Sequence, residues 1–122
     1  MTDSATKFVG PVTFAAVTGR AVQLDADLWR HDAHVPHVQL GEKADLMIIA
    51  PATANTLAKL AHGQADNLLT VVALAARCPI ILVPAMDGGM WSNAATQANV
   101  TTLRERGLHL CGPAMGRMAS GL

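Results

Sequence analysis

Short, continuous apolar runs alternate with helical patterns along the second part of the chain. Residues 46–50 (LMIIA), 79–85 (PIILVPA) and 108–112 (LHLCG) are runs of this kind. Such runs are typical of strands that are buried on both faces. The segments between them predict helices over 54–62, 66–77 and 92–106, the last with Ser92 as its N-cap. Strands and helices that alternate with short connections predict an α/β fold with a parallel sheet.

The first 45 residues have a weaker pattern. Residues 3–9 and 11–18 predict short helices, and residues 22–24 predict a brief strand. Residues 25–45 are polar and carry three of the five histidines, and we expect them to be irregular.

The segment 66–77 (DNLLTVVALAAR) is apolar nearly all round. Such a helix lies either inside a large core or at an interface between subunits. A chain of 122 residues with three clear strands has little core to enclose it, so the pattern favours oligomerisation.

Composition excludes several classes of function. The chain is long enough for one domain, and its formal net charge is zero, so it has no electrostatic footprint for nucleic acid or for an anionic membrane. No apolar run approaches the roughly 20 residues that cross a bilayer, and no signal-peptide pattern is visible. Cys78 and Cys111 lack CxxC spacing and are predicted to be buried thiols of a reducing compartment. We therefore expect a cytoplasmic protein.

Two predicted strands end in similar polar turns. "IIAPATANT" and "ILVPAMDGGMW" share a strand, a proline, a small residue and polar residues before a helix. In a parallel sheet both turns lie at the carboxyl edge, where open α/β folds bind ligands. Thr53, Asn55 and Thr56 can act as helix caps or can offer hydroxyl and amide groups to a ligand. The pattern alone is compatible with both roles.

The histidines permit a similar pair of interpretations. His31, His34 and His37 recur every third residue, which suggests a metal site. Pro36 interrupts a helix that would align them and a fourth ligand is not evident, so we expect no metal. His37 precedes a predicted strand and is either a hydrogen-bonded structural residue or an acid/base catalyst.

Three motifs in order resemble those of a known family. They are a histidine in an HxxL setting, the PASANT-like turn in "APATANT" and the PxMNxxMW-like turn in "PAMDGGMW". Together they resemble the flavoprotein domain of phosphopantothenoylcysteine decarboxylase, within the homo-oligomeric flavin-containing cysteine decarboxylases. In bacteria that domain is commonly the N-terminal half of a bifunctional coenzyme A biosynthesis protein. The resemblance covers nearly the whole chain.

The resemblance implies a Rossmann-like (flavodoxin-like) parallel sheet with helices on both faces, formed here in part. It also implies trimers that assemble further, with FMN bound between subunits. The implied reaction converts 4′-phospho-N-pantothenoylcysteine to 4′-phosphopantetheine. Oxidation by FMN turns the thiol-bearing carbon into a thioaldehyde, an electron sink from which carbon dioxide leaves. Return of the hydride to the resulting enethiolate makes the reaction redox-neutral.

The family's functional residues transfer by position in the motifs. His37 matches the acid/base histidine, and Ala85 matches a flavin contact in the second turn. Two further segments match flavin contacts: Thr2, Asp3 and Ser4, and then Thr53, Ala54, Asn55 and Thr56.

The chain also departs from the family pattern. It begins after the strand, turn and helix that hold the flavin phosphate in the family, and the glycine-rich stretch after "SGL" is missing. We therefore expect residues 1–122 to be a flavoprotein domain that is incomplete at both termini. Asp87 stands where the family usually has the asparagine that binds the substrate carboxylate. Ser120 stands where many members have the cysteine that protonates the enethiolate.

These departures leave two alternatives to the decarboxylase interpretation. One is a related flavoprotein decarboxylase with another substrate. The other is a non-catalytic or regulatory subunit of the same fold, which lends His37 or Asp87 to the site of a partner.

Overall fold

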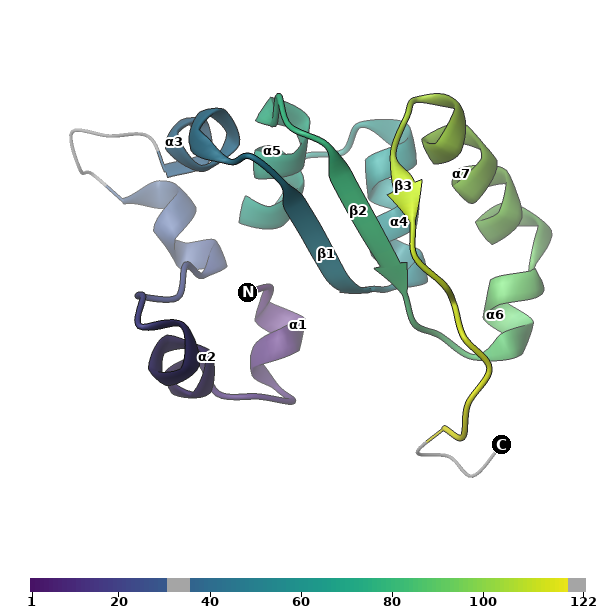
Figure 1. Cartoon of the computed structure of the whole chain (residues 1–122), viewed down its shortest axis with the longest axis horizontal. Helices are drawn as coiled ribbons and strands as arrows, with labels where there is room; N and C mark the ends of the chain where they lie inside the picture. The colour runs from purple at the N-terminus through teal and green to yellow at the C-terminus, as the bar shows by residue number, and fades with distance from the viewer. Residues whose placement is uncertain (31–35, 119–122) are drawn as a thin grey trace.

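The computed structural model describes residues 1–30 and 36–118. Figure 1 shows how their helices and strands are arranged. In chain order the elements are α1 (Asp3–Thr6), α2 (Pro11–Thr18), the 3-10 helix η1 (Asp25–Trp29), α3 (Pro36–Lys43), β1 (Met47–Ala52), α4 (Ala54–His62), α5 (Leu68–Ala75), β2 (Ile80–Pro84), α6 (Gly88–Ser92), α7 (Ala94–Glu105) and β3 (His109–Leu110).

The strands form one parallel sheet. Within the described residues it has three strands in the order β1-β2-β3. Ile49 lies opposite Leu82, and Leu82 lies opposite Leu110. The predicted α/β class, the parallel sheet and the positions of the three strands are confirmed.

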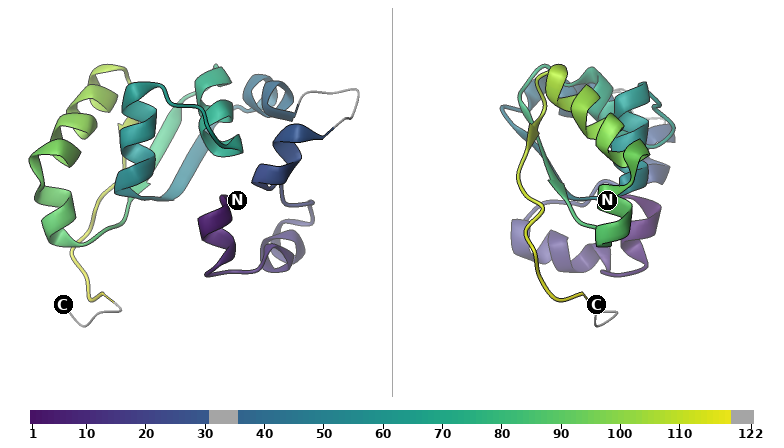
Figure 2. Two further views of the ribbon diagram at one scale, coloured as in Figure 1. Left: turned by 180° about the vertical axis from the view of Figure 1, so that it is seen from behind. Right: turned by 90° about the vertical axis from the view of Figure 1, so that its right-hand side faces the viewer.

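The core lies between one face of the sheet and two helices. Ile49 and Leu82 point to this face with 3% and 0% of their surfaces exposed. Leu57 of α4 and Leu103 of α7 pack against them. The next strand residue, Ile48, points to the opposite face and is 58% exposed. Figure 2 shows α4, α5 and α7 on the same side of the sheet.

The apolar helix α5 is covered by elements that the sequence pattern did not predict. Helix α3 and the 3-10 helix η1 both contact α5, and both lie in the segment 25–45 that we expected to be irregular. That expectation is wrong because Pro36 begins a helix rather than interrupting one, which is a position that suits its fixed φ. Intramolecular packing therefore accounts for much of the apolar surface of α5.

Two other boundaries differ from the prediction. Residues 22–24 form no strand in the structure. The helix predicted over 92–106 is preceded by a separate short helix, and its N-cap is Asn93 rather than Ser92. The Asn93 side chain accepts a hydrogen bond from the Ala95 amide at 2.9 Å, which Ser92 does not do because its hydroxyl donates to the Gly88 carbonyl at 2.9 Å.

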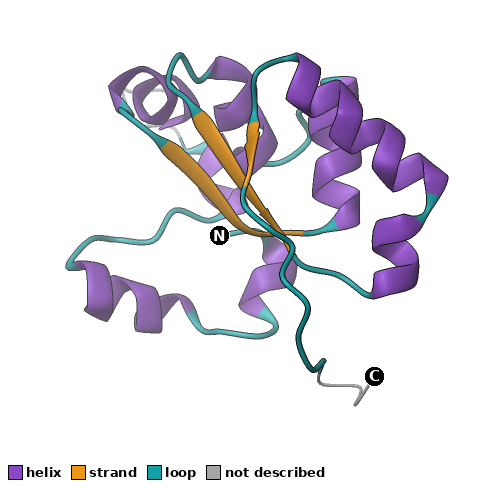
Figure 3. Cartoon of the chain, turned by 45° about the vertical axis from the view of Figure 1, so that its right-hand side comes forward, coloured by secondary structure: helices purple, strands orange, loops and turns teal. Residues whose placement is uncertain are grey.

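Helix α2 is apolar and largely uncovered. It contains no buried residue, and Val12 and Val17 are 77% and 81% exposed. Figure 3 shows α2 standing away from the sheet and from the helices that cover it. No helix among the described residues is both long enough and apolar enough to cross a membrane.

Candidate functional site

The two polar turns meet at the carboxyl edge of the sheet. Ala52 at the end of β1 pairs with Pro84 at the end of β2. The Ala85 amide then donates a hydrogen bond to the Ala52 carbonyl at 3.2 Å. This contact extends the ladder by one step beyond β2 and holds the turn after β1 against the turn after β2.

The first turn uses one threonine as a helix cap. The Thr53 hydroxyl oxygen accepts a hydrogen bond from the Thr56 amide at 3.2 Å, and the two hydroxyl groups are also 3.2 Å apart. Thr53 is therefore the N-cap of α4, as one of the two interpretations of this turn predicted. Asn55 is exposed, and its amide forms no hydrogen bond within the described part of the chain. The turn thus carries a cap and a polar group that is available to a ligand.

The second turn is shaped around Asp87. Its carboxylate accepts a hydrogen bond from the Gly89 amide at 2.8 Å and caps α6. A Cβ at Gly89 would lie 3.0 Å from that carboxylate, so the absence of a side chain lets the carboxylate approach closely without shifting. Ala85 is exposed beside it, and Asp87 itself is half-buried. The small side chain of Ala85 leaves the backbone of the turn open to a flat ligand.

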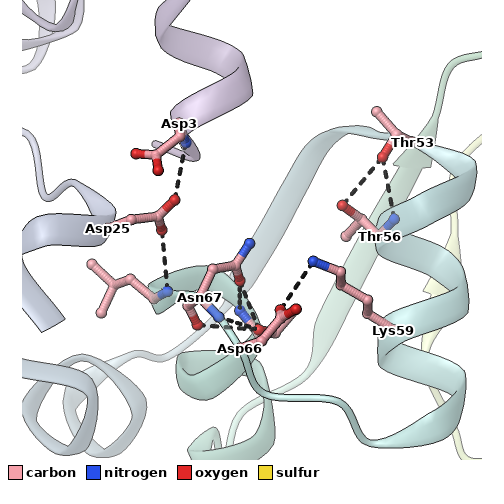
Figure 4. A network of polar contacts seen from close by, with 9 residues as sticks. Asp3, Asp25, Thr53, Thr56, Lys59, Asp66 and Asn67 are labelled. Atoms are coloured by element: carbon pink, nitrogen blue, oxygen red, sulfur yellow. Dashed lines mark hydrogen bonds and ion pairs between the residues drawn. The ribbon is translucent and has the colours of Figure 1, made fainter.

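The segment Thr2–Ser4 forms the start of α1. The Thr2 hydroxyl accepts a hydrogen bond from the Ala5 amide at 3.1 Å and acts as the N-cap. The Asp3 amide donates to the Asp25 carboxylate at 3.0 Å. Figure 4 shows this contact beside the start of α5. The segment is therefore anchored to the body of the chain by Asp25.

His37 lies away from the two turns. It is the second residue of α3, which contacts α5 and η1, and Figure 1 shows α3 beside the beginning of β1 rather than its end. Its Nδ1 atom is buried and has no hydrogen-bond partner within the described residues. An unpartnered buried imidazole nitrogen is unfavourable, so this atom is suited to bind a group other than the described residues.

The remaining predicted residues lie outside the described part of the chain or carry no site. Ser120, His31 and His34 belong to the residues that the structure does not describe. Across residues 1–30 and 36–118 no group of three His, Cys, Asp or Glu side chains could hold a metal ion.

Neither cysteine is in a disulfide. The expectation that both are buried is wrong for Cys111, which is exposed, and Cys78 is half-buried.

Asp25 is the residue that the sequence analysis missed. Its carboxylate contacts backbone amides 22 and 43 residues away, and a pattern of short-range periodicity carries no signal for such contacts. The neighbouring Asp27 has a local role: its carboxylate accepts a hydrogen bond from the Leu24 amide at 2.6 Å. This bond, with the nearby Arg30 guanidinium, lowers the pKa of Asp27 below its ordinary value.

Comparison with known proteins identifies the family. The flavoprotein family model matches residues 1–121, and the chain belongs to that family. The chain is similar to the coenzyme A biosynthesis bifunctional protein CoaBC of Mycobacterium tuberculosis strain H37Rv, with 50% identity over 117 residues. It is also similar to the corresponding protein of Vibrio cholerae, with 41% identity over 121 residues.

Solved structures agree with this assignment. The FMN-dependent cysteine decarboxylase SpaF is 46% identical with a TM-score of 0.89, and the match covers 95% of this chain and 66% of that one. A PPC decarboxylase mutant complexed with pantothenoylaminoethenethiol is 36% identical with a TM-score of 0.86, and the match covers 98% of this chain and 68% of that one. The two CoaBC proteins are much longer than this chain. The match to the M. tuberculosis protein covers 96% of this chain and 28% of that protein, and the match to the V. cholerae protein covers 99% of this chain and 30% of that protein.

Proposed function

We propose that residues 1–122 act as an FMN-dependent decarboxylase domain, with 4′-phospho-N-pantothenoylcysteine as the substrate and 4′-phosphopantetheine as the product. The observation that carries the proposal is the pair of turns joined by the Ala85–Ala52 hydrogen bond. Their motifs match those of the family, and their position at the carboxyl edge of a parallel sheet is where such folds bind ligands. The CoaBC relatives are named for coenzyme A biosynthesis, which supports this substrate.

The residues at the two turns fit a flavin. Ala54 and Ala85 are small, the Asn55 amide is free within the described chain, and Thr53 is exposed. We propose that these residues hold FMN together with Thr56 and the Thr2–Ser4 segment. When bound, FMN would accept two electrons from the thiol-bearing carbon, which makes the cysteine carboxylate labile, and it would return these electrons to the decarboxylated product afterwards.

We assign acid/base work to His37 and substrate contact to Asp87. The Nδ1 of His37, which has no partner among the described residues, lies on an imidazole ring, the side chain best suited to acid/base work next to a bound group. Because α3 lies at the start of β1 and the turns lie beyond the strand ends, a second copy of the chain is the natural source of the His37 that completes each site. Ser120 is proposed as the proton donor in the final step.

The assembly proposed here is a homo-oligomer based on a trimer. Its support is the apolar surface of the N-terminal helices, where Phe8, Val12 and Val17 are 87%, 77% and 81% exposed. Exposed apolar groups clustered in this way are typical of an interface. Sedimentation equilibrium measures the oligomer directly, and Val17→Glu is expected to dissociate it.

We place the protein in the cytoplasm, where its unpaired cysteines would stay reduced.

A second substrate class is favoured by two observations. SpaF, described as an FMN-dependent cysteine decarboxylase, matches this chain with a TM-score of 0.89. Asp87 also replaces the asparagine expected from the family motif. A different cysteine-containing substrate is therefore the alternative, and a parallel assay of phosphopantothenoylcysteine and a peptide with a C-terminal cysteine separates the two.

The first test is a visible absorption titration of the chain with FMN. We expect a perturbed flavin band in the wild type and a weaker one in Asn55→Ala. Gln64→Ala is the matched control, because Gln64 also carries an exposed amide and follows the other end of α4. An unperturbed flavin spectrum in the wild type would contradict the flavin site, and equal losses in both variants would contradict the role of Asn55.

A further inference from the structure

One carboxylate connects the starts of two helices that are far apart in sequence. Asp25 Oδ2 accepts a hydrogen bond from the Asp3 amide at 3.0 Å, and Asp25 Oδ1 accepts one from the Leu68 amide at 3.2 Å. Asp3 is the first residue of α1 and Leu68 is the first residue of α5. Figure 4 shows the carboxylate between the two amides.

The local caps of both helices leave these two amides for Asp25. In α1 the Thr2 hydroxyl binds the Ala5 amide, and in α5 the Asn67 side chain binds the Thr70 amide at 2.9 Å. Neither cap reaches the first amide of its helix. A negative charge at this position is favourable because helix N-termini carry partial positive charge, and here one charge serves two helices.

A second backbone contact holds the same segments together. The Met1 nitrogen donates a hydrogen bond to the Gln23 carbonyl at 2.6 Å. Residues 1–3 are thus connected at two points to residues 23–25. Because α2 contributes no buried residue, the α1 segment depends on contacts of this kind for its position relative to the sheet.

An ion pair connects the loop before α5 to α4, the helix that the Thr53 turn begins. Asp66 is next to the Asn67 cap, and its carboxylate forms an ion pair with the Lys59 ammonium of α4 at 2.9 Å. Lys59 lies one helical turn beyond Thr56, whose amide binds the Thr53 hydroxyl. Figure 4 shows these contacts as separate groups: the Asp25 carboxylate between α1 and α5, the Lys59–Asp66 ion pair, and the Thr53–Thr56 cap at the start of α4.

We propose that Asp25 is a positioning residue for the flavin site. It sets the Thr2–Ser4 segment at a defined place relative to the Thr53 turn, so that both predicted flavin-contacting segments can meet one ligand. This inference rests on the proposed function. The chemistry requires a carboxylate, because two acceptor oxygens must face two backbone donors at once. An asparagine at this position offers one oxygen and turns a donor toward the second amide.

The test compares Asp25→Asn with Asp27→Asn in the whole chain. Both changes remove one negative charge from the same 3-10 helix. Within the described residues the Asp27 carboxylate is hydrogen-bonded to the Leu24 amide and paired with Arg30 rather than bonded to α1 or α5, and an asparagine there can still accept the Leu24 amide. We expect Asp25→Asn to weaken FMN binding roughly tenfold and to change the visible circular dichroism of the bound flavin. Asp27→Asn should do neither, and Asp25→Glu, which keeps both oxygens, should recover part of the loss.

Hydrogen exchange of the flavin-free chain gives a second measurement that does not depend on cofactor. The Asp3 and Leu68 amides should exchange faster in Asp25→Asn than in the wild type. Their exchange rates should be the same in Asp27→Asn as in the wild type. If the wild type binds FMN and Asp25→Asn binds it equally well with the same spectrum, the positioning role is wrong. If the wild type binds no FMN, the proposed function fails. If the exchange rate of the Asp3 amide is the same in the wild type and in Asp25→Asn, the hydrogen bond from Asp25 does not hold α1 in place and the positioning role is wrong.

Discussion

The amide of Ala85 donates a hydrogen bond to the carbonyl of Ala52 over 3.2 Å, and this single contact places the turn after β1 beside the turn after β2. Both residues are alanines, so no side chain separates the two backbones. Ala52 is fully buried, whereas Ala85 is exposed. The arrangement gives a rigid inner edge and an open outer surface on which Thr53, Asn55 and Asp87 are displayed.

Asp87→Asn should strengthen the binding of a substrate that carries a carboxylate. An asparagine can keep the hydrogen bond from the Gly89 amide, so the cap of α6 survives while the charge is removed. Relief of repulsion between two carboxylates is expected to lower KM about tenfold. Steady-state kinetics at several substrate concentrations measure it. Unchanged KM and turnover would show that Asp87 does not face the substrate.

Substitutions in the Thr53 turn should affect either stability or ligand binding, depending on the residue that is changed. Thr53→Ala removes the cap of α4 and should lower the free energy of unfolding by about 1 kcal/mol, while Thr53→Ser should keep it. Asn55→Ala should leave stability unchanged and weaken FMN binding. Urea unfolding and flavin titration of the same variants test the separation, which fails if Asn55→Ala destabilises as much as Thr53→Ala.

The core between the sheet and α7 should be sensitive to truncation. Leu82 has no exposed surface, and Leu82→Ala is expected to lower the free energy of unfolding by about 2–5 kcal/mol because it leaves a cavity. Leu74→Ala is the control, since Leu74 is 67% exposed and should cost less than about 1 kcal/mol. Equal effects in denaturant unfolding would mean that Leu74 is covered in solution, as at a subunit interface.

Gly63 should not tolerate a side chain. It ends α4 with φ +68°, and a Cβ there would contact nothing within 4 Å, so the cost of Gly63→Ala comes from the backbone alone. We expect a loss of about 1–2 kcal/mol in the free energy of unfolding. Gly116→Ala, at an equally open site without positive φ, should have little effect. A neutral Gly63→Ala in thermal or urea unfolding would contradict the left-handed cap.

Asp27 should contribute to the pH dependence of stability. Its folded pKa lies below its ordinary value, chiefly because the ionised carboxylate accepts the Leu24 amide. Its contribution is therefore present above the unfolded pKa, roughly pH 4, and is lost as the pH falls through the lowered folded pKa. The difference in unfolding free energy between wild type and Asp27→Asn should shrink from pH 5 to pH 2. A constant difference would contradict the shift.

The amino-acid sequence by itself determined the strands, most of the helices that follow them and the turns that carry the site. Continuous apolar runs such as residues 79–85 can be satisfied only inside a sheet, and the Thr53 turn combines a strand end with a good helix cap. These signals are local, so short-range pattern is sufficient to find them. The motif order in the same segments was enough to predict the family that the comparisons then showed.

Only the tertiary structure decided how segments distant in sequence are brought together. Periodicity gave no sign that α3 and η1 would cover the apolar surface of α5. The Asp25 carboxylate, in a stretch expected to be irregular, reaches amides 22 and 43 residues away. The separation of His37 from the Thr53 turn was equally hidden. Contacts of this kind depend on how whole elements pack, and that packing is determined by shape and burial over the entire chain rather than by neighbouring residues.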